Sequence, residues 1–100
     1  MMPGMVVLTA YARFRSESID EGLAACAIVR GHSVKEPGCE RYDFFQSPDD
    51  RALVVFVEEW TSKADLDRHF EQDAFKEFGL AIKGLLEGAP EIRIFESTLI

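Results

Sequence analysis

The sequence predicts an α+β domain whose strands and helices follow one another in the order β-α-β-β-α-β. Two segments rich in β-branched and aromatic residues, 39–45 and 53–60, flank a turn in the middle of the chain. A helical pattern lies on each side of this hairpin, and a strand pattern lies near each end of the chain. The arrangement is ferredoxin-like, with a four-stranded antiparallel sheet and helices on one face. We expect one domain over residues 1–100, with its core in about 5–97.

The first strand is predicted over residues 5–14, where both alternating sets of side chains contain apolar groups, so we expect cover on both faces. A helix follows, with Ser16 or Ser18 as its cap. Its apolar face is expected to hold Ile19, Leu23, Cys26, Ala27 and Val34. Pro37 and Gly38 end this helix, because Pro disfavours helical geometry in the preceding residue and Gly accepts a positive φ.

The hairpin leads into a second helix after residue 60. Thr61 or Ser62 is expected to cap that helix, and Asp65 would complete a capping box from Ser62. Polar residues at 71–73 interrupt the apolar pattern, so the sequence predicts a break in the helix there.

A third helical segment and a last strand complete the chain. The third segment is predicted over residues 75–86, and either Gly84 or Gly88 is expected to end it. The last strand is predicted over residues 91–99, where the side chains alternate along the strand.

Helices on one face of the sheet would leave Val, Phe and Leu side chains bare on the other face. An exposed apolar patch of that size usually marks an interface. Face-to-face pairing of two sheets would cover it, so we expect a homodimer.

The charge and the absence of two nucleotide-binding motifs reduce the number of functions that we expect. The net charge is −7 and the pI is about 4.7. Binding to nucleic acid or to an anionic membrane depends on clustered Lys and Arg, so we expect neither as a partner. Neither a dinucleotide-binding glycine motif nor a P-loop motif occurs in the sequence.

No segment is apolar over the length that spans a bilayer, and residues 1–5 lack the basic and apolar parts of a signal peptide. We interpret residues 1–5 as a flexible start. Cys26 and Cys39 form no metal-binding or redox motif, and His32 and His69 lack ligand-type neighbours, so no metal is expected. Two reduced thiols and the missing secretion signal favour a cytoplasmic protein.

Ten residues spread over the middle of the chain form a pattern of known type. They are Glu36, Pro37, Gly38, Cys39, Tyr42, Glu58, Trp60, Leu66, His69 and Phe75. This pattern resembles that of the antibiotic-biosynthesis monooxygenase family, small quinol-monooxygenase-like domains, over about residues 5–97. The resemblance implies a dimeric α+β barrel. It also implies a cofactor-independent monooxygenase that acts with O₂ on an electron-rich aromatic, either a quinol or an anthrone-like compound.

Related branches of the family imply other activities. Haem-degrading relatives carry Trp at the position of His69 and a haem-ligating His at the position of Gly79, so the resemblance does not imply haem here. Two alternatives stay open: a non-catalytic dimeric domain that binds a small ligand or serves as an accessory domain, and a small-molecule isomerase of the same fold.

Glu58 and Trp60 are two residues apart on a strand, so they share a face with Phe56. A carboxylate beside an indole in an apolar setting would have a raised pKa and could transfer a proton. Alternatively, Glu58 pairs with Arg13 or Arg93, or caps a neighbouring helix. Trp60 would pack at the end of the strand, line a cavity, or do both.

His69 is expected at the edge of the apolar helix face, where a neutral imidazole could take a proton from a phenolic substrate. The resemblance implies such a base at this position, and His69→Ala is then expected to cost activity without much stability. The alternative is a half-buried imidazole satisfied by a carboxylate or a backbone carbonyl.

Other side chains could bind the substrate. The hydroxyls of Tyr11 and Tyr42 could orient a polar aromatic ligand, or they could simply lie at the rim of the sheet. Phe56 and Phe75 are core residues by default, and they could also line an apolar pocket between the sheet and the helices.

Overall fold

A computed structural model describes residues 4–100, so the predicted flexible start lies outside the described residues for positions 1–3. The order of elements is the predicted one, with the second helix divided in two. The elements are β1 (Met5–Arg13), a short 3₁₀ turn (Ser16–Ser18), α1 (Ile19–Ser33), β2 (Cys39–Gln46), β3 (Leu53–Trp60), α2 (Lys63–Phe70), α3 (Asp73–Ile82) and β4 (Glu91–Ser97).

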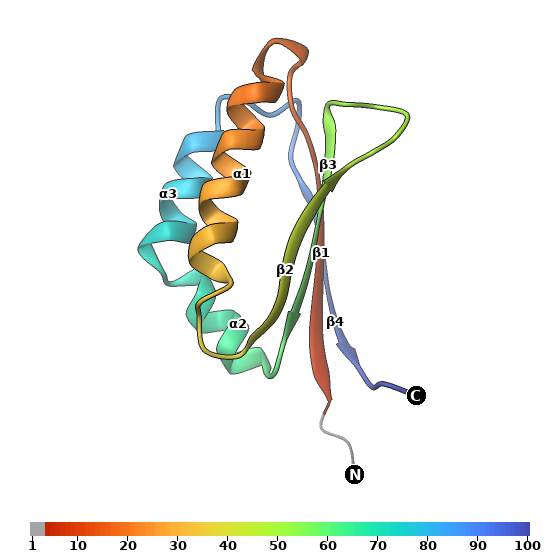
Figure 1. Cartoon of the computed structure of the whole chain (residues 1–100), viewed down its shortest axis with the longest axis vertical. Coiled ribbons are helices and arrows are strands. Elements are labelled where there is room, and N and C mark those ends of the chain that lie inside the picture. The colour runs from red at the N-terminus through yellow and green to blue at the C-terminus, as the bar shows by residue number, and fades with distance from the viewer. Residues whose placement is uncertain (1–3) are drawn as a thin grey trace.

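The four strands form one antiparallel sheet in the order β2-β3-β1-β4. All three helices lie on one side of it, and the other side is bare (Figure 1). The predicted α+β ferredoxin-like fold is therefore confirmed. The expectation that β1 is covered on both faces is wrong within this chain, because Tyr11 on the bare side is 42% exposed while Leu8 on the helix side is 3% exposed.

Two predicted boundaries in the last part of the chain differ from the structure, the end of α3 and the end of β4. The third helical segment ends at Ile82 instead of residue 86, because the chain turns back there toward the end of β1. Leu86 forms an isolated bridge with Phe14, and the Leu85 carbonyl accepts a hydrogen bond of 2.8 Å from the Arg15 amide. β4 ends at Ser97, two residues before the predicted boundary.

Helix α1 differs from its prediction in cap and in face. Ser18 occupies the N-cap position without a side-chain hydrogen bond, whereas Ser62 caps α2 as predicted by accepting the Asp65 amide at 3.1 Å. The buried positions of α1 are Gly22, Cys26, Val29 and Ser33. Ala27 and Val34 were predicted on this face and are exposed.

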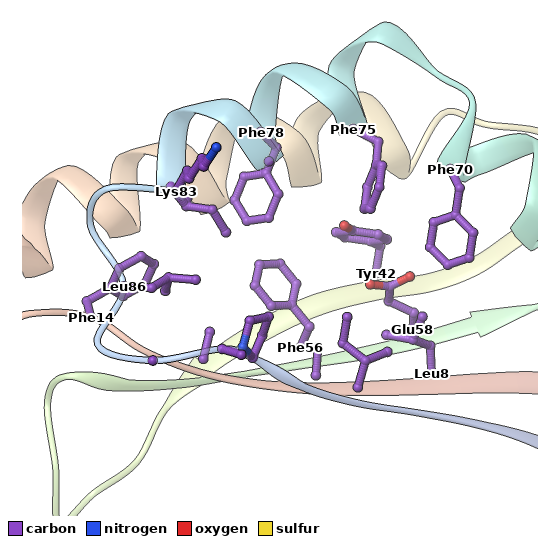
Figure 2. A pocket seen from close by; sticks show the side chains of 18 residues that line it. Leu8, Phe14, Tyr42, Phe56, Glu58, Phe70, Phe75, Phe78, Lys83 and Leu86 are labelled. Carbon is purple, nitrogen blue, oxygen red and sulfur yellow. The ribbon is translucent and has the colours of Figure 1, made fainter.

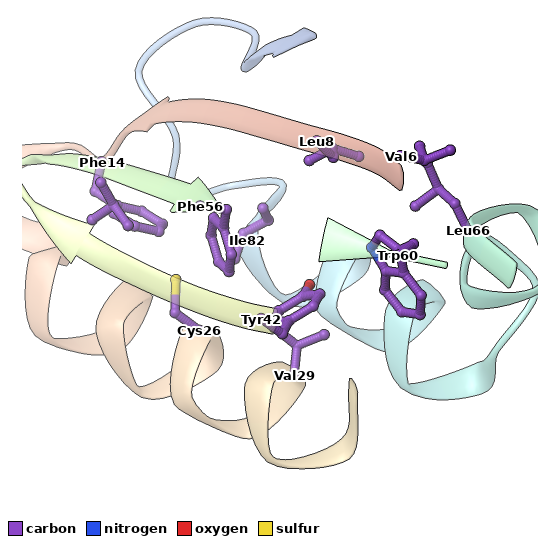
Figure 3. Close-up of a cluster of buried hydrophobic side chains, with 11 residues drawn as sticks. Val6, Leu8, Phe14, Cys26, Val29, Tyr42, Phe56, Trp60, Leu66 and Ile82 are labelled. Carbon is purple, nitrogen blue, oxygen red and sulfur yellow. The ribbon is translucent and has the colours of Figure 1, made fainter. Parts of the chain in front are cut away.

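The core lies between the sheet and the helices. Trp60, Leu66 and Tyr42 are buried at one end of it, and Phe14 is buried at the other (Figure 3). Within residues 4–100, α1 is the longest helix at 15 residues, and no helix has both the length and the apolar character needed to cross a membrane.

Candidate functional site

A pocket of about 410 Å³ lies between the sheet and α3, within the size range of small-molecule sites. Aromatic and aliphatic side chains form most of its wall (Figure 2). Only three of the lining residues are titratable: Tyr42, Glu58 and Lys83. Glu58 lies at one end of the pocket beside Phe70, and Lys83 lies at the other end beside Leu86 (Figure 2).

Strand β3 brings Glu58 into the pocket. Its alternation turns Val54, Phe56, Glu58 and Trp60 toward the helices, and each of the four is buried. Glu58 is 4% exposed, and its Oε1 accepts a hydrogen bond of 3.0 Å from the Trp60 indole nitrogen. Burial raises the pKa of Glu58 to about 7, and the Trp60 indole and the Tyr42 hydroxyl partly oppose this rise.

The alternative partners expected for Glu58 lie elsewhere. Arg13 pairs with Asp50, and Arg93 pairs with Glu91 at 2.8 Å. The expectation of an Arg partner is therefore wrong, and the neighbour that holds Glu58 is a neutral indole. An uncompensated buried carboxyl group favours its protonated form, which is the physical cause of the raised pKa.

The predicted substrate-binding residues separate into two groups. Tyr42, Phe56 and Phe75 line the pocket. Tyr42 is 3% exposed, and its ring meets that of Phe56 edge-to-face with centroids 5.9 Å apart. Tyr11 lies on the bare side of the sheet, because its neighbours Ala10 and Ala12 point toward the helices and line the pocket. Tyr11 and the pocket are thus on opposite faces.

His69 lies behind the pocket wall. It is 1% exposed and is not among the lining residues, so it is buried more deeply than expected. Its ring is enclosed by aromatic side chains whose centroids lie 4.8–5.7 Å away, namely those of Trp60, Phe75, Tyr42 and Phe70. Phe70 and Phe75 contact the imidazole and also line the pocket.

Glu36 fixes the orientation of the His69 ring. Its two carboxylate oxygens lie 3.0 and 3.2 Å from Nδ1. Because an ionised carboxylate only accepts hydrogen bonds, Nδ1 carries the proton and Nε2 is left as an acceptor. Nε2 is buried and has no partner within residues 4–100. Burial lowers the pKa of His69, although Glu36 acts in the opposite direction.

Sequence reasoning missed two residues near the site. Glu36 was named only as a member of the ten-residue pattern, without a role in the site, and Lys83 was not considered at all. The presence of Glu36 and His69 in one pattern was an available signal for their contact. No signal in the sequence indicated Lys83, because its place at the pocket depends on how the chain turns after α3.

Comparisons with known proteins give one consistent result. The family model described as "Antibiotic biosynthesis monooxygenase" matches residues 5–79. A proposed monooxygenase of Bacillus subtilis, YcnE, is 30% identical over 88 residues, which cover 88% of this chain and 93% of that protein. An uncharacterised protein of Synechocystis is 29% identical over 91% of this chain, which spans only 62% of the length of that relative.

Solved structures agree on the fold. A proposed antibiotic biosynthesis monooxygenase of Nitrosomonas europaea has a TM-score of 0.91 at 22% identity, with 97% of this chain and 92% of that chain covered. A conserved protein of Methanosarcina mazei also has a TM-score of 0.91, at 25% identity, with 96% and 95% of the two chains covered.

Proposed function

The chain belongs to the antibiotic biosynthesis monooxygenase family, and from this premise we propose that it is a cofactor-independent monooxygenase of an electron-rich aromatic substrate, a quinol or an anthrone-like compound. The observation that supports the proposal most directly is that Glu58 carries the only carboxylate among the residues that line the apolar pocket. Its pKa of about 7 suits a group that accepts a proton near neutral pH.

In the proposed reaction, Glu58 takes the proton of the substrate's phenol or acidic C–H group. The resulting anion is electron-rich enough to pass an electron to O₂, and the two radicals combine into a peroxide. Loss of water from the peroxide gives the oxidised product. A CH₂ group and O₂ become C=O and H₂O, and a hydroquinone and O₂ become a hydroxyquinone and H₂O. Both equations balance without another reductant.

The surrounding residues have supporting roles in this proposal. The Trp60 indole holds one carboxylate oxygen of Glu58 at 3.0 Å, which fixes the base in place. Phe56, Phe70 and Phe75 exclude water from the reacting carbon and give O₂ an apolar path. His69 was expected to be the base, and we now assign it a positioning role, since it packs between Trp60 and Phe75.

Oxygen uptake by the purified protein tests the proposal against a panel of hydroquinones and anthrones. These compounds autoxidise, so only the rate above a boiled-protein control counts. We expect saturable uptake without added flavin or metal, and we expect Glu58→Gln to abolish it. The matched control is Glu59→Gln, which removes the neighbouring carboxylate on the other face of β3. Equal uptake by Glu58→Gln and the unaltered protein would refute Glu58 as the base.

One observation favours the second candidate, a non-catalytic ligand-binding domain. The imidazole that the family resemblance implied as a base is buried and is not among the residues that line the pocket. A domain that only binds a ligand needs the pocket and no exposed base. Saturable binding of the aromatic compounds without oxygen uptake on any of them would support this candidate.

We also propose that two copies pair through the bare face of the sheet and that the protein is cytoplasmic. Large apolar side chains on the outward face support the pairing: Phe95 is 47% exposed and Phe45 is 56% exposed. Sedimentation equilibrium is expected to give twice the mass of one chain. Phe45→Glu, which places a charge on this face, is expected to give single chains, and a wild-type mass of one chain would refute the pairing.

A further inference from the structure

We propose that the ligand of the pocket carries an anionic group, such as a carboxylate, at the end opposite its reactive hydroxyl, and that Lys83 binds this group at the pocket mouth. The inference rests on the proposed function, since it concerns the same pocket and names the class of ligand that it accepts.

The distribution of polar groups along the pocket supports a ligand with an anionic group at one end. Tyr42 and Glu58 are the titratable groups at one end, and Lys83 is the titratable group at the other end (Figure 2). The remaining lining residues are apolar side chains or glycine. The titratable side chains that a ligand in the pocket can contact therefore lie at its two ends, a carboxyl group and a phenol at one end and an ammonium group at the other.

Four of the eleven Lys and Arg residues make no ion pair within residues 4–100, namely Arg15, Lys35, Arg51 and Lys83, and of these four only Lys83 lines the pocket. Lys76 on α3 lies 3.8 Å from Glu71, and Lys63 pairs with Asp67 at 2.5 Å. Within residues 4–100, Lys83 has no carboxylate within 4.0 Å.

The chain that follows Lys83 at the pocket leaves room for a ligand group. Gly88, Ala89 and Pro90 line this end, and none of them has a side chain that could pair with the lysine. Ile92 of β4 is 54% exposed although it lies on the helix side of the sheet. The helices therefore do not cover the β4 edge of the pocket.

The experiment compares two ligands of nearly the same shape, 6-hydroxy-2-naphthoate and its uncharged carboxamide. Each carries a hydroxyl group at one end, and only the first carries a negative charge at the other. Isothermal titration calorimetry measures the dissociation constant of both for the unaltered protein and for Lys83→Gln. The control variant is Lys76→Gln, which removes the same charge from α3, at a position that does not line the pocket.

We expect the unaltered protein to bind the carboxylate about fivefold more tightly than the carboxamide at low ionic strength, the upper range for a solvent-exposed ion pair. The ratio is expected to fall toward one in about 0.5 M salt, where exposed charges are screened. Lys83→Gln is expected to remove the preference and Lys76→Gln to keep it.

Two results would overturn the inference in distinguishable ways. If the two compounds bind equally, or if Lys83→Gln keeps the preference, then Lys83 only complements the carbonyl groups at the C-terminal end of α3, and the pocket itself remains supported. If neither compound binds to the unaltered protein, the proposed aromatic-binding function fails together with the inference.

Discussion

Replacing Glu58 with Gln is expected to make the protein more stable at neutral and alkaline pH. The folded protein holds the Glu58 proton up to a pKa of about 7, whereas the unfolded chain releases it near 4.5. Between these values the folded state binds more protons, so the stability contributed by Glu58 is present below about pH 4.5 and is lost as the pH rises to 7. Each pH unit corresponds to about 1.4 kcal/mol, which gives a total loss of about 3 kcal/mol.

The Gln variant has no proton to lose, and its amide oxygen can still accept the hydrogen bond from Trp60. Urea unfolding of both proteins at intervals between pH 4.5 and 8.5 measures the difference. We expect Glu58→Gln to gain about 3 kcal/mol relative to the unaltered protein over this range, with most of the gain below pH 7. A difference in unfolding free energy that does not change with pH would refute the raised pKa and, with it, the proposed base.

Four further variants follow from the same structure. Gly38 has φ of +82°, so Gly38→Ala is expected to lower the unfolding free energy by about 1–3 kcal/mol, whereas Gly31→Ala, in an open part of α1, is expected to raise it by up to about 1 kcal/mol. His69→Ala empties a fully buried site, so thermal unfolding is expected to show a loss of about 2–4 kcal/mol; a loss under 1 kcal/mol would contradict the packing role. Trp60→Phe removes a hydrogen bond that lowers the pKa of Glu58, so the rising limb of the pH–rate profile is expected to move to higher pH, and an unmoved limb would argue against Glu58 as the base.

Much of the fold could be predicted because local patterns and tertiary packing agree along most of the chain. The alternation in β3 placed Phe56, Glu58 and Trp60 on one face, and the structure buries all three. The face of α1 was less predictable because small and polar residues are buried there. Gly22 lies against the ring of Phe14, and this contact is possible because Gly has no side chain. A pattern of apolar residues along the helix does not reveal a contact of this kind.

The residues of the site could be predicted from the sequence, but most of the contacts between them could not. Glu58, Trp60 and His69 do lie in one cluster, with the indole and imidazole centroids 4.8 Å apart. The sequence placed Glu36 and His69 in one pattern, but it could not show that both carboxylate oxygens lie within 3.2 Å of the imidazole or that two Phe rings pack against it. Such pairings depend on how α2 and α3 pack, and the order of residues along each helix does not determine that.

The hydrogen bond between Glu58 and Trp60 also gives the protein an internal optical probe. Trp60 is the only tryptophan in the chain, so all indole emission comes from the residue that contacts the carboxyl group. A charge that appears on a hydrogen-bonded neighbour changes the energy of the excited indole, so intensity and wavelength of emission should titrate with Glu58. Fluorescence recorded against pH would then follow the ionisation of this one buried group directly, without a substrate and without knowledge of the reaction.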